Sequence, residues 1–335
     1  MPGKELRFIT IAYGIAAILV VLGHSHPLHR DYPTYISRLI KFIYTFHMPL
    51  FFFIAGMLIR YTDHNRSVLR WWWEKVKKLM IPYIVLSAVA WLPKVLLDSF
   101  LSDNMELSAT NILRMIFIPR DGVWGHFWFI PTYLILSLIG ACCCKLPNNR
   151  YINAGMIGGG GILLLVFPIN TDWIGLRDVS LNLLYILAGV VTSRYLISNE
   201  LKYGKPSVAA LTFIVSLCIF ILLQYVGSND KTVLYTIVAF SMIFFILVCS
   251  ILLSNKKNRG LKYVGERAFT VFIYSWPVQI TVEMVCVMVL KLNWAIVFLG
   301  MFIVGLLFPL LLYEFYLRCI PRRRFLDALI GINKN

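Results

Sequence analysis

Apolar segments long enough to cross a membrane recur along this chain from one end to the other. A transmembrane helix needs about 20 mostly apolar residues to cross roughly 30 Å of hydrocarbon. Hydrophobic residues make up 59% of the 335 residues and charged residues only 14%, too few to cover a soluble protein of this length. The sequence therefore predicts an all-α, polytopic membrane protein.

The apolar segments predict a single integral-membrane domain over residues 1–335, built as a bundle of about ten transmembrane helices. The predicted segments are Ile9–Gly23, Ile40–Arg60, Leu79–Leu97, Phe127–Leu146, Tyr151–Phe167, Val179–Ile197, Ser207–Gly227, Thr232–Leu253, Phe269–Leu290 and Ala295–Leu317.

The chain has a net charge of +16, and the positions of its basic residues predict how it is oriented in the membrane. Most of the 32 lysines and arginines lie in alternate connecting segments, which the positive-inside rule assigns to the cytoplasm. Both termini are then expected to be cytoplasmic, and no nucleic-acid partner is implied. The seven cysteines lack the spacing of metal ligands, so no metal site is expected.

Two histidines lie where apolar helices are predicted. His24 directly follows the run Ile11–Gly23, and His47 lies inside the run Phe46–Gly56. Ionisable groups in membrane segments are costly and usually face a cavity or a partner. Because the topology puts both near the outer ends of adjacent helices, they predict a polar site inside the bundle.

The first predicted helix carries a second polar group on the face of His24. Tyr13 precedes His24 by 11 residues, so at about 100° per residue the two share a face, roughly 16 Å apart along the axis. An interfacial histidine and a packed tyrosine would give the same pattern, and spacing leaves both readings open.

Five segments in order along the chain resemble the membrane-bound acyltransferase family 3. Each match alone is weak, and the second is the most specific. The segments are Tyr13–Ser25, Phe46–Gly56, Lys75–Tyr83, His126–Phe129 and Gly265–Pro277.

The resemblance implies an integral-membrane acyltransferase, often one that O-acetylates a sugar. We expect acetyl-CoA or another acyl-CoA as cosubstrate, with no bound cofactor. The expected acceptor is a cell-surface polysaccharide or a lipid-linked sugar, and the expected location is the bacterial inner membrane. His24 matches the family's essential histidine, as a base or as a transient acyl carrier, and His47 is expected to support it.

The chain departs from the family pattern at three positions. The family commonly has a cation where this chain has Tyr13 and an acidic residue where it has Thr10, so a possible ion pair is missing. Tyr13 can still hydrogen-bond, and we place it in the substrate path. The family often has histidine where this chain has Trp276.

A basic stretch on the predicted cytoplasmic side is the expected donor contact. Arg70, Lys75, Lys77 and Lys78 lie beside Trp71–Trp73, and a basic motif of the family falls on the three lysines. Such cations suit the phosphates of coenzyme A. A positive-inside anchor with interfacial tryptophans is the competing interpretation.

The remaining candidates are polar or aromatic residues near the predicted site. His126 and Trp128 are placed in the sugar acceptor site, because aromatic faces stack on sugar rings, and Ser275 is placed along the pathway. Glu283 and Glu314 fall within predicted helices, where we expect a carboxylate to pair or to line a cavity.

Two other functions fit the same pattern. A transporter or lipid-linked sugar flippase would also contain membrane histidines and helices interrupted by proline. A catalytically inactive partner in polysaccharide synthesis would account for the departures at Thr10, Tyr13 and Trp276. The acceptor, the acyl group and the oligomeric state are not predicted.

Overall fold

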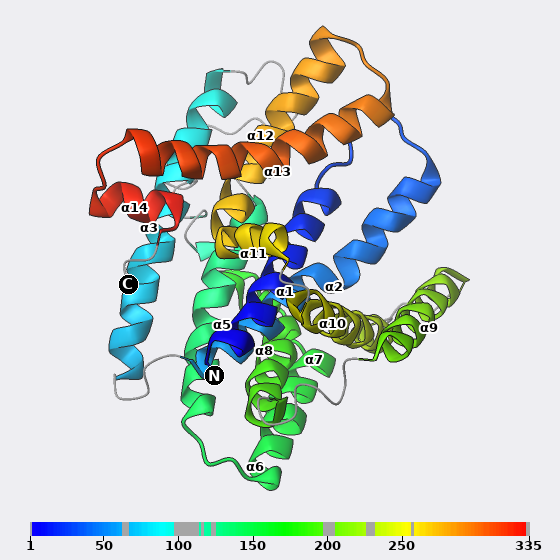
Figure 1. Ribbon diagram of the computed structural model, residues 1–335, viewed down its shortest axis with the longest axis vertical. Coiled ribbons are helices and arrows are strands. Elements are labelled where there is room, and N and C mark those ends of the chain that lie inside the picture. Colours follow the sequence, from blue (N-terminus) through cyan, green and yellow to red (C-terminus); the bar gives the residue numbers. More distant parts are fainter. Residues whose placement is uncertain are drawn as a thin grey trace. The chain divides into compact units, whose positions relative to one another are not determined.

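Figure 1 shows the protein as a computed structural model. The structure describes residues 2–61, 67–96, 114, 117–121, 125–196, 205–225, 232–255 and 258–332. Every regular element within these ranges is helical, which confirms the predicted all-α class.

Within the residues that the structure describes, six helices are long and apolar enough to cross a membrane. They are α2 (Thr34–Ile59), α8 (Leu176–Leu196), α9 (Pro206–Tyr225), α10 (Thr232–Asn255), α12 (Ala268–Met284) and α13 (Trp294–Cys319). The chain is thus a multi-pass membrane protein. A count of about ten spans and the cytoplasmic placement of both termini remain predictions.

The other predicted segments are also helical, but shorter, broken or more charged. They include α1 (Pro2–Gly23), α3 (Val68–Leu96), α5 (Phe129–Cys144), and α6 (Arg150–Gly155) with the π-helix η4 (Met156–Ile162) and α7 (Leu163–Val166). The described part of the chain also contains these short elements: η2 (Pro119–Asp121), η3 (Gly125–Trp128), η5 (Trp173–Gly175), α11 (Arg259–Glu266), η6 (Val285–Val289) and α14 (Arg324–Ile330).

The chain divides into two compact units. The first unit comprises residues 1–54 and 195–322, and the second comprises residues 55–194 and 323–335. The first unit therefore contains α1, most of α2 and α9–α13, and the second contains α3, α5–α7, nearly all of α8, and α14.

In the first unit, glycines allow α1 and α11 to approach backbone to backbone. A β-carbon at Gly265 would collide with the carbonyl oxygen of Thr10, and one at Gly14 would collide with that of Leu261. Small residues permit such close crossings. Both of these glycines lie in segments that resemble the acyltransferase family.

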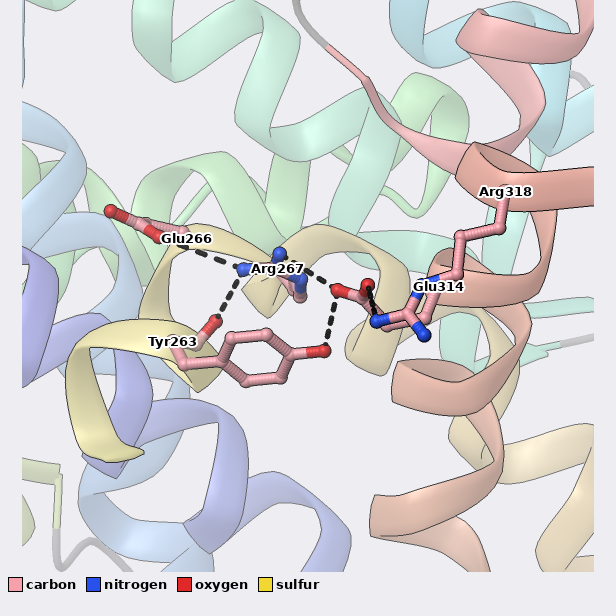
Figure 2. Close-up of polar contacts among 5 residues, drawn as sticks. All are labelled: Tyr263, Glu266, Arg267, Glu314 and Arg318. Carbon is pink, nitrogen blue, oxygen red and sulfur yellow. Dashed lines mark hydrogen bonds and ion pairs between the residues drawn. The ribbon is translucent and has the colours of Figure 1, made fainter. Parts of the chain in front are cut away.

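A charged network joins α11, the start of α12 and α13 (Figure 2). Arg267 donates to Glu314 at 2.9 Å, and the Tyr263 hydroxyl donates to the same carboxylate at 2.7 Å. The Arg267 guanidinium lies 3.7 Å from the centre of the Tyr263 ring. The Glu314 carboxylate is therefore paired, as expected for an acidic residue within an apolar helix.

In the second unit, polar side chains tie helix ends to neighbouring helices. Trp72 Nε1 on α3 donates to the Leu134 carbonyl of α5 at 2.8 Å. Arg194 on α8 donates to the Cys143 carbonyl at the end of α5 at 2.8 Å. Arg60 donates to the Ser193 carbonyl at 2.6 Å. The carbonyls of Cys143 and Ser193 lie in the last turns of α5 and α8, where a helix leaves its carbonyls without backbone donors, whereas that of Leu134 lies within α5.

Candidate active site

The first unit brings the two predicted histidines together. His24 follows the last residue of α1, and His47 is buried on α2, with their ring centroids 6.4 Å apart and nearly perpendicular. Trp276 of α12 lies against His24, with ring centroids 4.9 Å apart. Trp276, which stands where the family often has histidine, therefore packs directly against the His24 ring.

Tyr44 is a member of this cluster that the sequence analysis did not identify. Its hydroxyl donates to the Gly23 carbonyl at 3.1 Å and lies 3.2 Å from His24 Nδ1. A phenol has one proton, so while it donates to Gly23 it accepts from the Nδ1–H of His24. This tautomer puts the basic lone pair on Nε2, where it can accept a proton.

If the protein is the acyltransferase that its sequence resembles, replacing Tyr44 with phenylalanine should lower kcat about tenfold and leave KM for the acyl donor unchanged. The hydroxyl orients the imidazole, while the ring that packs on the histidines is kept. Steady-state kinetics of acyl transfer check this result. A variant with wild-type kcat would show that Tyr44 does not orient His24.

His47 is oriented by its own helix. Its Nδ1 lies 3.0 Å from the Ile43 carbonyl one turn earlier, to which it donates. That bond leaves Nε2 as the acceptor nitrogen. The Tyr44 ring packs near both imidazoles, with its centroid 5.1 Å from that of His47 and 5.6 Å from that of His24.

The other candidates of the first unit lie on the same helices. Tyr13 is half-buried on α1, with its ring 5.7 Å from that of Phe51. Ser275 is buried on α12, directly before Trp276. Ser275 is thus the sequence neighbour of Trp276 in the cluster. Tyr13 lies three turns of α1 before His24.

The predicted donor residues lie on α3 of the second unit and differ in their surroundings. The Lys75 ammonium donates to the Tyr133 hydroxyl at 2.9 Å and lies 4.1 Å from the centre of the Trp71 ring. Lys77 lies 5.7 Å from the centre of the Trp73 ring, and Arg70 is an exposed partner of Glu74 at 3.9 Å. These three cations already have aromatic or acidic neighbours.

Lys78 differs from them. Among the residues that the structure describes, no hydrogen bond or ion pair reaches its half-buried ammonium. Burial, and secondarily the charge of Lys75, lower the pKa of Lys78 to about 8. It directly precedes the predicted span Leu79–Leu97.

The predicted acceptor residues lie on η3, also in the second unit. The backbone of His126 is part of η3, and its side chain lies outside the described part of the structure. The Trp128 ring is covered by the Arg120 guanidinium at 4.4 Å. Arg120 in turn pairs with the buried Asp178 through two bonds of 2.8 and 2.5 Å. Neither Arg120 nor Asp178 was predicted from the sequence.

The arrangement around His24 suits proton transfer. An imidazole with a fixed tautomer, bounded by two aromatic rings and a second imidazole, can accept a proton from a hydroxyl that attacks a reactive carbonyl. The chemistry that these residues support is acid–base catalysis of group transfer.

A family model described as "Acyltransferase domain" matches residues 6–314. The chain belongs to acyltransferase family 3. The family match covers both units and all five segments that carry the resemblance, and it favours a membrane acyltransferase over a transporter.

One curated relative extends over nearly the whole chain. Glucans biosynthesis protein C of Escherichia coli (strain SMS-3-5 / SECEC) is 21% identical over 364 aligned residues, which cover 96% of this chain and 92% of that protein. No solved structure matches the chain at a significant level.

Proposed function

We propose that this member of acyltransferase family 3 moves an acyl group, most readily acetyl, from acyl-CoA to a hydroxyl of a saccharide. The observation that carries the proposal is the His24, His47 and Trp276 cluster at the end of α1 in a chain of this family. The proposed location is the bacterial inner membrane, with both termini in the cytoplasm.

His24 acts as the general base in this reaction. Its Nε2 removes the proton of the acceptor hydroxyl as that oxygen attacks the thioester carbonyl carbon. The new C–O ester bond forms, the C–S bond breaks, and coenzyme A leaves as a thiolate that takes up a proton. In the alternative mechanism, His24 is the nucleophile and carries the acyl group transiently before the acceptor hydroxyl takes it.

The donor's phosphates are assigned to the cations of α3. Lys78 contributes an ammonium with no other partner among the described residues, while Lys75 and Lys77 add positive charge nearby in sequence. Trp71 and Trp73 offer flat faces to the adenine. A phosphate beside Lys78 would stabilise its charged form, which burial alone disfavours.

The Lys78 contact predicts a pH dependence. The fraction of charged Lys78 in the free enzyme falls as the pH rises through about 8, so kcat/KM for acyl-CoA should fall between about pH 7 and pH 9. Lys78→Arg stays charged and should keep kcat/KM constant over that range. Identical profiles for the two proteins would show that Lys78 does not bind the donor.

The acceptor is proposed to be a glucan or a related surface saccharide. This proposal rests on the name of the relative, which refers to glucan biosynthesis, and on the half-buried Trp128 and the exposed Arg120 at or near η3. Trp128 and Arg120 are the described residues there that can contact a sugar ring and its hydroxyls.

Transfer of labelled acetyl groups tests this function. Membranes containing the protein are supplied with acetyl-CoA labelled in the acetyl group and a saccharide extract, and the extract is then analysed for alkali-labile label. Label in ester linkage on saccharide supports the proposal. Movement of a lipid-linked sugar across the membrane without loss of thioester would instead identify a flippase, and inactivity without a second membrane protein would identify a partner subunit.

A further inference from the structure

The carbonyl end of α1 is held by side chains. The backbone N–H of Ser25 donates to the Leu22 carbonyl at 3.2 Å. In a continuing helix that N–H would donate to the Val21 carbonyl, which is therefore left without a backbone donor. Ser25 Oγ donates to Val21 at 2.6 Å, and Gln279 Nε2 of α12 donates to the same oxygen at 2.8 Å and to Ser25 Oγ at 3.0 Å. His24 lies between the two residues that Gln279 holds.

A second residue of α12 holds the segment that follows. Glu283 Oε1 accepts the backbone N–H of Leu28 at 2.5 Å and that of His29 at 2.8 Å. Gln279 and Glu283 are four residues apart, so they lie on one face of α12, the face that also carries Ser275. This helix therefore fixes the chain on both sides of the turn after His24.

Burial makes these two contacts costly to maintain. Gln279 is 0% and Glu283 1% exposed, and among the described residues neither Gln279 Oε1 nor Glu283 Oε2 has a hydrogen-bond partner. A buried acceptor without a donor destabilises a fold. Leucine or methionine would fill the same space without that cost, so packing alone does not explain these residues.

We propose that Gln279 and Glu283 are positioning residues, which hold the turn after α1 so that His24 stays against Trp276 and Tyr44. The proposal rests on the role of His24 proposed above. Neither side chain takes part in the reaction. Gln279 acts through the Val21 carbonyl and the Ser25 hydroxyl, and Glu283 acts through the N–H groups of Leu28 and His29 and through the His29 ring, whose Nδ1 lies 3.3 Å from Glu283 Oε1.

Gly305 of α13 completes the arrangement. A β-carbon at this position would lie 2.7 Å from Gln279 Cγ and 2.9 Å from its Cδ, so the glutamine would have to move. Gly300 on the same helix has room, because its β-carbon would lie 3.5 Å from the nearest atom, on Val282. The two glycines give a matched pair for testing Gln279 without altering it.

The test compares acetyl transfer by Gly305→Ala, Gly300→Ala, Gln279→Ala and the double variant Gly305→Ala/Gln279→Ala. We expect Gly305→Ala and Gln279→Ala each to lower kcat about tenfold or more with KM for acetyl-CoA unchanged. Gly300→Ala should keep the wild-type kcat. The double variant should be no worse than the worse single variant, because both changes act through one side chain.

Multiplicative losses in the double variant, or wild-type kcat in Gln279→Ala, would overturn the role of Gln279. If Gly305→Ala does not fold, as judged by its melting temperature in detergent, Glu283 provides a second comparison. Glu283→Gln keeps an acceptor for the two N–H groups and should retain kcat, while Glu283→Leu should lose it. Equal losses in both would overturn positioning by Glu283.

The outcome for His24 separates this proposal from the function. If the Gln279 and Glu283 variants keep the wild-type kcat while His24→Ala is inactive, only the positioning role is refuted. An active His24→Ala would refute the role of His24 on which the positioning proposal depends.

Discussion

Replacing His24 with alanine should lower kcat for acyl transfer by about a thousandfold. The alanine protein lacks the Nε2 lone pair that is proposed to accept the proton of the acceptor hydroxyl. KM for acyl-CoA should change little, because the donor contacts are assigned to α3. Initial rates of ester formation by purified protein, at saturating donor and acceptor, give this value.

His24→Gln is the appropriate companion variant. Glutamine preserves much of the side-chain volume beside Trp276 but is not basic, so it should be as inactive as alanine. Both variants should match the wild-type melting temperature in detergent within a few degrees. If either variant retained more than about a tenth of the wild-type kcat, His24 would not be the base.

Gly265→Ala should have the largest effect on stability. Its β-carbon would collide with the backbone carbonyl of Thr10, and backbone cannot move aside as a flexible side chain can. Overpacking of this kind costs about 3 kcal/mol and is expected to separate α1 from α11. The measurement is the unfolding midpoint in mixed detergent micelles, followed by tryptophan fluorescence.

Gly260→Ala is the matched control on the same helix. A β-carbon there would lie 3.7 Å from Asn258 Oδ1, an ordinary contact, and alanine favours helix over glycine by up to about 1 kcal/mol. Its unfolding midpoint should equal or exceed the wild-type value. Equal midpoints for Gly265→Ala and wild type would mean that α1 and α11 are not packed as the structure shows.

The helical class and the histidine pair were predictable because their signals are local. Apolar length identifies a membrane helix, and a histidine at the end or inside one points to a polar site. The spacing of Tyr44 and His47, three residues apart on one helix, contained a signal for Tyr44 that the sequence analysis did not use.

Contacts between helices were not predictable from one sequence. Whether Gln279 faces α1 or lipid depends on how α12 is rotated about its axis, and an apolar helix has little amphipathic pattern to reveal it. The pairing of Arg120 with Asp178 joins residues 58 positions apart. Likewise, the four predicted donor cations looked alike in sequence, and only their neighbours in space distinguish Lys78 from Lys75.

The most direct test of the central claim is coenzyme A release by purified protein in lipid vesicles. Acetyl-CoA is supplied with and without a surface-saccharide extract, for wild type and for His24→Ala. If His24 is the base of acyl transfer to a saccharide, wild type releases coenzyme A only with the extract and forms a matching amount of ester on the saccharide, and the variant does neither. Folded wild-type protein that binds acetyl-CoA but releases no coenzyme A with any saccharide fraction, or that does not bind acetyl-CoA, would contradict it.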